Sequence, residues 1–303
     1  MKKPIIEVVG SVNMDLVVKL DRFPKEGETL SGTSFFTAAG GKGANQAVAA
    51  ARLGAAVSFV GCVGDDSFGK EMLSSMRNEH INVDQIKVTK GLNTGVAAIM
   101  VNHRAQNQIV VVPGANYSIS KKQIEEIFSQ KHEGTGALLL QLEIPIEIVV
   151  ESAIQAKKKD FTVILNPAPA RELPKELLEN VDYLILNEHE AKLLSNKTDI
   201  QAAAQILWKM GVKHIIVTLG DKGALYVNGK ENIFIPAFSI EAVDPTAAGD
   251  SFVGAFAVCI MKEMSIKESM RYANAVGALA TTKMGAQPSL PTSSEVDRFL
   301  SLQ

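Results

Sequence analysis

The stretch Asp244-Pro-Thr-Ala-Ala-Gly-Asp250, which continues as Ser251-Phe-Val-Gly-Ala-Phe-Ala-Val258, places a turn of small residues directly before an apolar helix. The first backbone N–H groups of a helix have no partner within it and attract anions. Phosphoryl transfer to a hydroxyl needs such an amide cradle beside a carboxylate that can take a proton from an alcohol, and Asp250 would supply that carboxylate. The same residues also fit an ordinary helix N-cap, and this stretch alone leaves both interpretations open.

Outward from this helix, short apolar runs alternate with helix-like segments along the 303 residues. Runs such as 137–142 and His214–Thr218 are almost continuously apolar, as strands buried on both faces should be. Segments such as 44–53 and 199–210 have the spacing of intervening helices. This alternation predicts one α/β domain over residues 1–303, with a mainly parallel central sheet flanked by helices.

Two segments interrupt the alternation. Residues 15–36 indicate a strand, a Pro24-Lys-Glu-Gly27 turn and a second strand, and residues 94–113 indicate a hairpin with a polar turn at 102–107. Antiparallel hairpins inserted into such a chain usually form a sheet of their own. We therefore expect a small β-sheet that serves as a lid or as an oligomer surface.

Composition and charge argue against several classes of protein. The net charge of −2 provides no overall field that would attract nucleic acid or an anionic membrane. No apolar run approaches the ~18 residues of a membrane span, and the N-terminus lacks the apolar core of a signal peptide. Cys62 and Cys259 lack metal-ligand spacing and are typical of buried thiols in a reducing compartment. A cytoplasmic protein without nucleic-acid or membrane partners is expected.

Several further segments place polar groups where strands end, which is where open α/β sheets bind ligands. Asn13 and Asp15 lie on one face of a strand and suit sugar hydroxyls or ordinary turn chemistry. The loop Gly40-Gly-Lys-Gly-Ala-Asn-Gln46 opens an alanine-rich helix, but it lacks the Ser or Thr of a phosphate-binding P-loop. It is expected to bind a polar ligand or to serve only as a tight turn.

Two later segments also lie where expected strands end. Asn187-Glu-His-Glu190 could hold Mg²⁺ through water, or could simply favour a helix N-terminus. Thr218-Leu-Gly-Asp-Lys-Gly223 could wrap a nucleotide or merely connect two strands.

Taken together and in order, these segments resemble the PfkB-type (ribokinase) family of carbohydrate kinases. The resemblance spans almost the whole chain and also includes Leu165-Asn-Pro-Ala-Pro-Ala170 and Gly285-Ala-Gln-Pro-Ser289. It implies a Rossmann-like α/β fold with a small β-sheet lid, and ATP-dependent phosphorylation of a sugar's primary hydroxyl, foremost O5 of D-ribose. Deoxyribose, fructose or a nucleoside are alternative substrates, and a non-catalytic sugar-binding regulator is an alternative of another class. The resemblance also implies a homodimer formed through the lid sheet.

The resemblance further assigns roles to residues of this chain. Asp250 is the expected base, and the backbone N–H groups of Ala247, Ala248, Gly249 and Asp250 form the expected anion hole. The matching sugar-contacting positions, with Asp250, are Asn13, Asp15, Gly41, Lys42, Asn45 and Glu143. The matching nucleotide-contacting positions are Asn187, Thr218, Gly220, Gly223, Gly249 and Asn274.

The same resemblance implies two metal ions. Glu190, with help from Asn187, would organise Mg²⁺. An activating monovalent cation, usually K⁺, would lie at Asp244, Thr246, Ala280, Lys283, Gly285 and Ser289, in part through main-chain carbonyls. Pro245 and Ser251 depart from the family pattern, in which many relatives carry Thr. Because proline fixes φ, we expect Pro245 to change the stiffness of the loop that would hold the monovalent cation.

Overall fold

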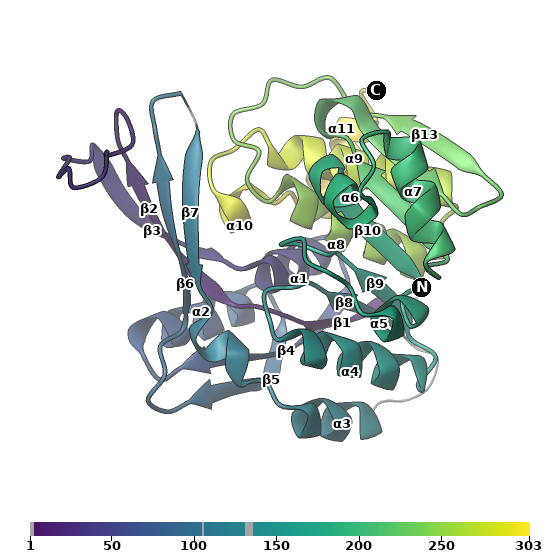
Figure 1. Cartoon of the computed structure of the whole chain (residues 1–303), viewed down its shortest axis with the longest axis horizontal. Coiled ribbons are helices and arrows are strands. Elements are labelled where there is room, and N and C mark those ends of the chain that lie inside the picture. The colour runs from purple at the N-terminus through teal and green to yellow at the C-terminus, as the bar shows by residue number, and fades with distance from the viewer. Residues whose placement is uncertain (1–2, 105, 131–135) are drawn as a thin grey trace.

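The computed structural model describes residues 3–104, 106–130 and 136–303 and contains two sheets (Figure 1). The large sheet has nine strands in the order β13-β12-β11-β10-β9-β8-β1-β4-β5, and the small sheet has four in the order β3-β2-β6-β7. The large sheet is flanked by helices. The predicted α/β class with a mainly parallel central sheet and a second small sheet is therefore confirmed.

Seven neighbouring strands of the large sheet, from β5 to β11, pair in parallel, whereas β12 and β13 pair antiparallel at one edge. Every residue of β8 is buried, which explains its uninterrupted apolar sequence. The strands are β1 (Ile5–Val9), β4 (Ala56–Gly64), β5 (Asn82–Thr89), β8 (Ala137–Leu140), β9 (Thr162–Leu165), β10 (Tyr183–Asn187), β11 (His214–Thr218), β12 (Gly223–Val227) and β13 (Asn232–Pro236).

Helices cover both faces of this sheet and bury two separate apolar clusters. Alternate residues of β1 point to opposite faces, so Val8 packs into one cluster and Val9 into the other. Helices α1, α8 and α9 supply the first cluster, and α3, α4 and α7 supply the second. The helices are α1 (Lys42–Arg52), α2 (Ser67–Asn78), α3 (Lys121–Ser129), α4 (Ile146–Lys157), α5 (Lys175–Glu179), α6 (Glu188–Ser195), α7 (Ile200–Lys209), α8 (Ala248–Met261), α9 (Ile266–Ala280), α10 (Ala286–Ser289) and α11 (Ser293–Leu300), with 3₁₀ turns η1 (Gly114–Ser118) and η2 (Gly220–Lys222).

The small sheet is built from the two segments that interrupt the α/β alternation. Its strands are β2 (Asn13–Lys19), β3 (Ser34–Gly40), β6 (Gly95–Val101) and β7 (Asn107–Val112). Each segment forms an antiparallel pair, and β2 joins the two pairs by lying parallel to β6. Because β2 follows β1 after only Gly10–Val12, the chain passes directly from one sheet into the other. Ala105, in the predicted turn at 102–107, lies outside the described residues.

Helix α8 differs from the prediction at its N-terminus. It begins at Ala248, and its N-cap is Ala247 in the left-handed region with φ 61°. Asp250 is therefore the third helical residue, and the interpretation of Asp250 as an N-cap is wrong. A search of the described residues finds no helix long and apolar enough to cross a membrane.

Candidate active site

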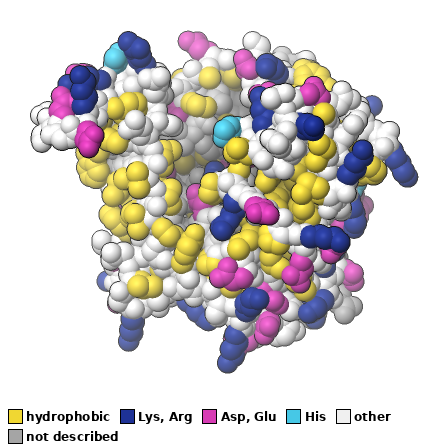
Figure 2. All heavy atoms as spheres, viewed as in Figure 1, with side chains coloured by type: hydrophobic (Ala, Val, Ile, Leu, Met, Phe, Trp, Pro, Cys, Tyr) yellow, Lys and Arg dark blue, Asp and Glu magenta, His cyan; other side chains and the backbone are white. Residues whose placement is uncertain are grey.

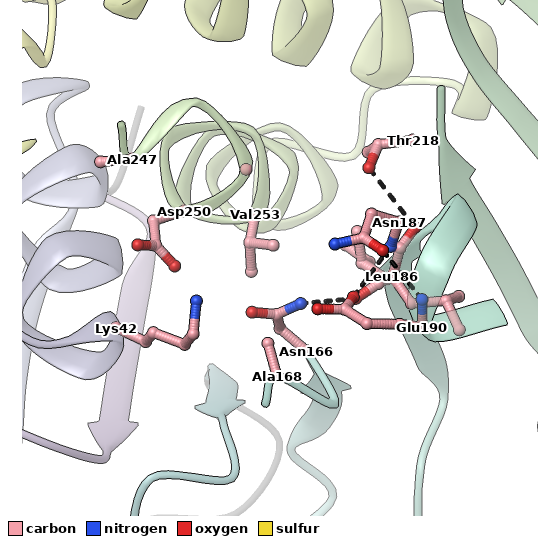
Figure 3. A pocket seen from close by; sticks show the side chains of 12 residues that line it. Lys42, Asn166, Ala168, Leu186, Asn187, Glu190, Thr218, Ala247, Asp250 and Val253 are labelled. Carbon is pink, nitrogen blue, oxygen red and sulfur yellow. Dashed lines mark hydrogen bonds between the residues drawn. The ribbon is translucent and has the colours of Figure 1, made fainter. Parts of the chain in front are cut away.

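A cleft of about 200 Å³ opens where the large sheet meets the N-terminus of α8. Its walls come from the ends of β10 and β11, the loop after β9, and the first turns of α1 and α8 (Figure 3). This is the carboxyl edge of the parallel strands, where the strand-end residues were expected to gather. The lining residues are Lys42, Asn166, Ala168, Ile185, Leu186, Asn187, Glu190, Thr218, Ala247, Gly249, Asp250 and Val253.

Asp250 carries a buried carboxylate in this cleft, and both of its oxygens accept hydrogen bonds from α1. The side-chain amide of Asn45 donates to Oδ2 and that of Gln46 donates to Oδ1, each at 3.1 Å. Helix α8 can approach α1 this closely because residue 254 is glycine: a Cβ there would lie 2.8 Å from the Gln46 carbonyl oxygen. The packing of two helices therefore sets the orientation of the expected base.

The turn before α8 is held in a strained conformation. A left-handed backbone is uncommon for a residue with a side chain, so Ala247 marks a local cost of about 1 kcal/mol or more. The N–H of Ala248 donates to the carbonyl of Pro245 at 3.2 Å, which closes the turn. A Cβ built on Gly249 would meet nothing within 4 Å, so its backbone is open to the cleft. First-turn N–H groups of this kind can receive an anion.

Among the residues expected to contact a sugar, Lys42 lines this cleft and Asn45 contacts Asp250, whereas Asn13 and Asp15 belong to β2 of the small sheet. Burial, followed by the carboxylates of Glu143 and Asp250, raises the pKa of Asp15 to about 7. The charge of Asp250 raises the pKa of Lys42, and Figure 3 shows the Lys42 ammonium directed toward that carboxylate. Lys42 is therefore a firmly charged cation at the floor of the cleft.

Hydrogen bonds from side chains and from the backbone hold the remaining groups on this side. One oxygen of Glu143 accepts from Ser11 Oγ at 2.5 Å and from the Lys42 N–H at 3.0 Å. Asn116 Nδ2 donates to Asn13 Oδ1 at 2.7 Å, so the Asn13 amide turns its own donor away from Asn116. Gly41 has φ 90°, which favours glycine at the start of α1.

Asn187 and Glu190 lie on the opposite wall of the cleft and form a capping box at the start of α6. Asn187 Oδ1 accepts from the Glu190 N–H, and Glu190 Oε2 accepts from the Asn187 N–H, both at 2.9 Å. Burial is the main reason that the pKa of Glu190 is raised. The two residues therefore stabilise the helix and also face the cleft beside Thr218, so capping and ligand binding are compatible.

Three of the residues assigned to the nucleotide do not line this cleft. Gly220 and Gly223 form the turn between β11 and β12. A Cβ at Gly223, where φ is 121°, would lie 2.1 Å from the Ile235 carbonyl oxygen, so the close pairing of β12 with β13 requires glycine there. Asn274 donates to the carbonyls of Ile235 and Pro236, both at 3.1 Å, and so holds the end of β13 against α9.

The residues assigned to a monovalent cation form a separate cluster beyond the strained turn. Asp244 accepts from both the N–H and the hydroxyl of Thr246, and its other oxygen accepts from the Gly285 N–H at 2.9 Å. Burial opposes ionisation, but these hydrogen bonds prevail and lower the pKa of Asp244. Ala280 and Ser289 are the last residues of α9 and α10, and both are buried.

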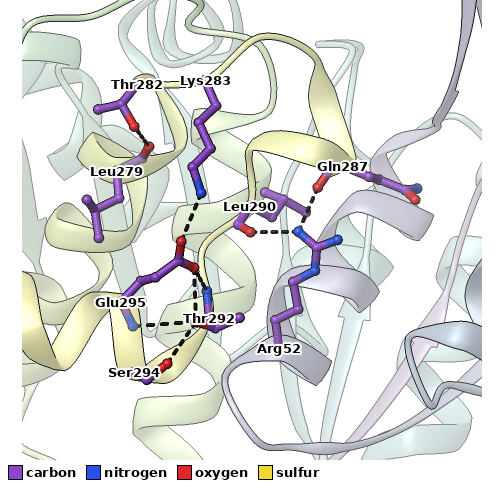
Figure 4. Close-up of polar contacts among 9 residues, drawn as sticks. All are labelled: Arg52, Leu279, Thr282, Lys283, Gln287, Leu290, Thr292, Ser294 and Glu295. Carbon is purple, nitrogen blue, oxygen red and sulfur yellow. Dashed lines mark hydrogen bonds and ion pairs between the residues drawn. The ribbon is translucent and has the colours of Figure 1, made fainter.

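Figure 4 shows how this cluster is anchored. The Lys283 side chain pairs with Glu295 at 2.9 Å. Arg52 of α1 donates to the carbonyls of Gln287 and Leu290 at 2.8 and 2.6 Å, which fastens both ends of α10. Arg52 also forms an ion pair with Glu79.

Several residues of the site were not singled out by sequence reasoning. They are Ser11, Gln46, Arg52, Asn116, Gln141 and Asn166, whose partners lie far away in the sequence. Two of them carried a signal: Gln46 follows Asn45 within the glycine-rich segment, and Asn166 lies in the stretch 165–170, which is part of the family resemblance.

Comparisons with known proteins agree with this architecture. A sequence model described as the pfkB family of carbohydrate kinases matches residues 3–293. A ribokinase of Haemophilus influenzae is 40% identical over 300 residues, covering 97% of this chain and 98% of that protein. A deoxyribokinase of Salmonella typhimurium is 36% identical over 303 residues, covering 98% and 99%.

A solved structure extends this likeness to the fold. The structure of Arabidopsis thaliana ribokinase complexed with ribose and ATP is 35% identical, with a TM-score of 0.90 and full coverage of both chains. This chain belongs to the pfkB family of carbohydrate kinases.

Proposed function

We propose that this protein is a ribokinase, which converts D-ribose and ATP into D-ribose 5-phosphate and ADP. The observation that carries the proposal is the Asp250 carboxylate, oriented by two amides and placed in the first turn of α8 at a cleft with polar groups on the sugar side. Full-length similarity to the Haemophilus influenzae ribokinase and to the ribose- and ATP-bound Arabidopsis thaliana enzyme supports this substrate pair.

In the proposed reaction Asp250 acts as the general base. It accepts the proton of the ribose O5 hydroxyl while O5 forms a bond to the γ-phosphorus of ATP. The bond between that phosphorus and the β,γ-bridging oxygen breaks, and ADP leaves with the electron pair. Backbone N–H groups of the segment from Ala247 to Asp250 stabilise the charge on the transferring phosphoryl group.

Binding groups on either side of Asp250 position the two substrates. On the sugar side, Asn13, Asp15, Gly41, Lys42, Asn45 and Glu143 offer donors and acceptors to ribose hydroxyls. On the nucleotide side, Asn187, Thr218 and Gly249 line the cleft. Gly220, Gly223 and Asn274 lie outside it and are the remaining positions proposed to contact ATP. Holding O5 and the γ-phosphorus close together supplies much of the rate acceleration in this class of reaction.

Glu190 and Asn187 are the residues that would organise Mg²⁺. Among the residues that the structure describes, no group of three or more His, Cys, Asp or Glu side chains could hold a metal ion. Mg²⁺ usually keeps several waters and binds through one or two carboxylates together with substrate phosphates. Bound there, Mg²⁺ would neutralise charge on the β- and γ-phosphates.

The second proposed cation is K⁺, held by the cluster of Asp244, Thr246, Ala280, Lys283, Gly285 and Ser289. The low pKa of Asp244 keeps a negative charge in a loop tied to residue 285. Such a cation would stiffen the turn that precedes the anion hole, because Asp244 and Ala247 belong to the same short segment.

We also propose a cytoplasmic homodimer that associates through the small sheet, which would act as a lid. Every residue of β7 is exposed, including Val110 at 61%, and Phe35 of β3 is 64% exposed. Figure 2 shows hydrophobic side chains gathered over this sheet on the left of the view. An exposed apolar patch of this kind is typical of an interface. Light scattering at micromolar concentration should give the mass of two chains, and a monomer would contradict the proposal.

A substrate screen tests the central proposal. ADP release is coupled to an optical signal for D-ribose, 2-deoxy-D-ribose, D-fructose and adenosine, each with K⁺ or with Na⁺ as the control cation. We expect the highest kcat/KM with ribose and K⁺. The similarity to a deoxyribokinase favours 2-deoxyribose as the second candidate. A higher kcat/KM for 2-deoxyribose would make it the assigned substrate in place of ribose. Sugar binding without ADP release would indicate a regulator instead.

A further inference from the structure

Gln46 lies behind Asp250 and is completely buried. Its amide nitrogen donates to Asp250 Oδ1 at 3.1 Å and to Asn166 Oδ1 at 3.2 Å, and its amide oxygen accepts from Gln141 Nε2 at 2.6 Å. Both hydrogens of the amide group are therefore used, and its oxygen is engaged on the other side. Such a fully bonded amide is rigid, because any rotation breaks several buried hydrogen bonds at once.

The partners of Gln46 permit only one orientation of its amide group. In the opposite orientation its oxygen would face the carboxylate of Asp250 and the carbonyl oxygen of Asn166, and its NH₂ group would face the NH₂ group of Gln141. Acceptors would then meet acceptors, and donors would meet donors. The surroundings thus oblige Gln46 to present a hydrogen-bond donor to Asp250.

The other two partners of Gln46, besides Asp250, lie at the ends of strands of the large sheet. Asn166 directly follows β9, lines the cleft, and donates from Nδ2 to the carbonyl of Ile185 in β10 at 2.9 Å. Gln141 directly follows β8 and is fully buried. The ends of neighbouring parallel strands therefore fix Gln46, and Gln46 transmits that fixed position to the carboxylate on α8.

We propose that Gln46 is a positioning residue that aims the Asp250 carboxylate at the sugar hydroxyl. Together, Gln46 and Asn45 place one amide donor on each carboxylate oxygen, so each oxygen keeps a lone pair for the hydroxyl. This inference rests on the proposed role of Asp250 in the reaction. It adds Gln46, which acts by holding Asp250 and not by contacting either substrate.

The test compares Gln46→Met with wild type, using the sugar that gives the highest turnover. Methionine keeps the approximate volume but removes the donor. We expect kcat to fall about 10- to 100-fold, because a small misplacement of a reacting group costs up to this factor. The KM values for sugar and ATP should change much less. A kcat within twofold of wild type would overturn the proposal.

Gln123→Met is the matched control. Gln123 of α3 is also buried and donates to a backbone carbonyl, that of Gln85 at 3.2 Å, but it is remote from the cleft. Its substitution should lower Tm and leave kcat unchanged. If both variants lower kcat alike, the effect is one of stability and the proposal fails.

Crystal structures of wild type and Gln46→Met test the orientation without any assay of activity. We expect the Asp250 carboxylate to rotate in the variant, and an unchanged rotamer would overturn the proposal. Absence of ribose phosphorylation by wild-type protein would contradict the proposed function alone, because the rotamer comparison still decides the role of Gln46.

Discussion

The side-chain amide of Asn45 on α1 donates to Oδ2 of Asp250 on α8 at 3.1 Å, although the two residues are 205 positions apart in sequence. One end of this hydrogen bond belongs to the glycine-rich segment that faces the sugar side, and the other is the proposed base. A sugar bound by Asn45 would therefore lie next to the group that removes its proton. In the proposed function this contact would link substrate binding directly to the chemistry.

Replacing Asp250 with asparagine removes the proposed base while keeping its size. We expect Asp250→Asn to lower kcat by roughly 10²–10⁴, the usual contribution of general acid–base catalysis. The Tm and the ATP affinity should change little. Coupled ADP release measures kcat, and calorimetric titration with ATP measures the affinity. Near-wild-type turnover would rule out Asp250 as the base.

Asp15 should make the free protein less stable as the pH rises. Its pKa is about 7 in the folded protein against an ordinary value of 3.8, so the folded state holds its proton more tightly than the unfolded state. The stability that this provides is complete below pH 3.8 and is lost as the pH rises through 7. We therefore expect the Tm of Asp15→Asn, relative to wild type, to be higher at pH 8 than at pH 5.

Thermal unfolding without ligands at the two pH values measures this effect. Asp84→Asn, at an exposed position of β5, is the control and should give the same Tm difference at both. A relative Tm for Asp15→Asn that does not rise from pH 5 to pH 8 would contradict the prediction. The same variant should bind ribose more weakly, because Asp15 is a proposed sugar ligand.

Asp244 should determine the response to K⁺. Asp244→Asn keeps the size of the side chain but removes the charge, so we expect the K⁺ concentration for half-maximal activity to rise about tenfold. The increase in Tm that KCl produces relative to NaCl at equal ionic strength should shrink in parallel. Asp199→Asn is the control, since Asp199 also accepts a backbone N–H but lies at the start of α7. Identical K⁺ responses of the two variants would show that Asp244 does not hold the cation.

Glu190 can be tested for a role beyond helix capping. Glutamine can still accept the Asn187 N–H, so Glu190→Gln preserves this hydrogen bond while removing the charge. We expect the Mg²⁺ concentration for half-maximal activity to rise about 10-fold or more, with a small change in Tm. Glu190→Ala should lower Tm as well, because it loses the cap. Wild-type Mg²⁺ dependence in the glutamine variant would leave Glu190 with a capping role only.

Local patterns in the sequence determined the class of fold and much of the candidate site. Continuous apolar runs such as Thr162–Leu165 predict buried parallel strands, and the two interrupting hairpins predict the small sheet, because periodicity and turn chemistry act over a few residues. The loop before α8 and the polar groups at strand ends could likewise be located from the sequence. These features depend on neighbours along the chain.

Only the tertiary structure decided how these pieces meet. The parallel pairing of β2 with β6, the start of α8 at Ala248, and the use of Asn274 to hold β13 depend on contacts between distant residues. The same is true of Gln46, whose three partners come from separate elements. A sequence shows which side chains can donate or accept, but the packing of α8 on α1 and on the strand ends selects which of them face Asp250.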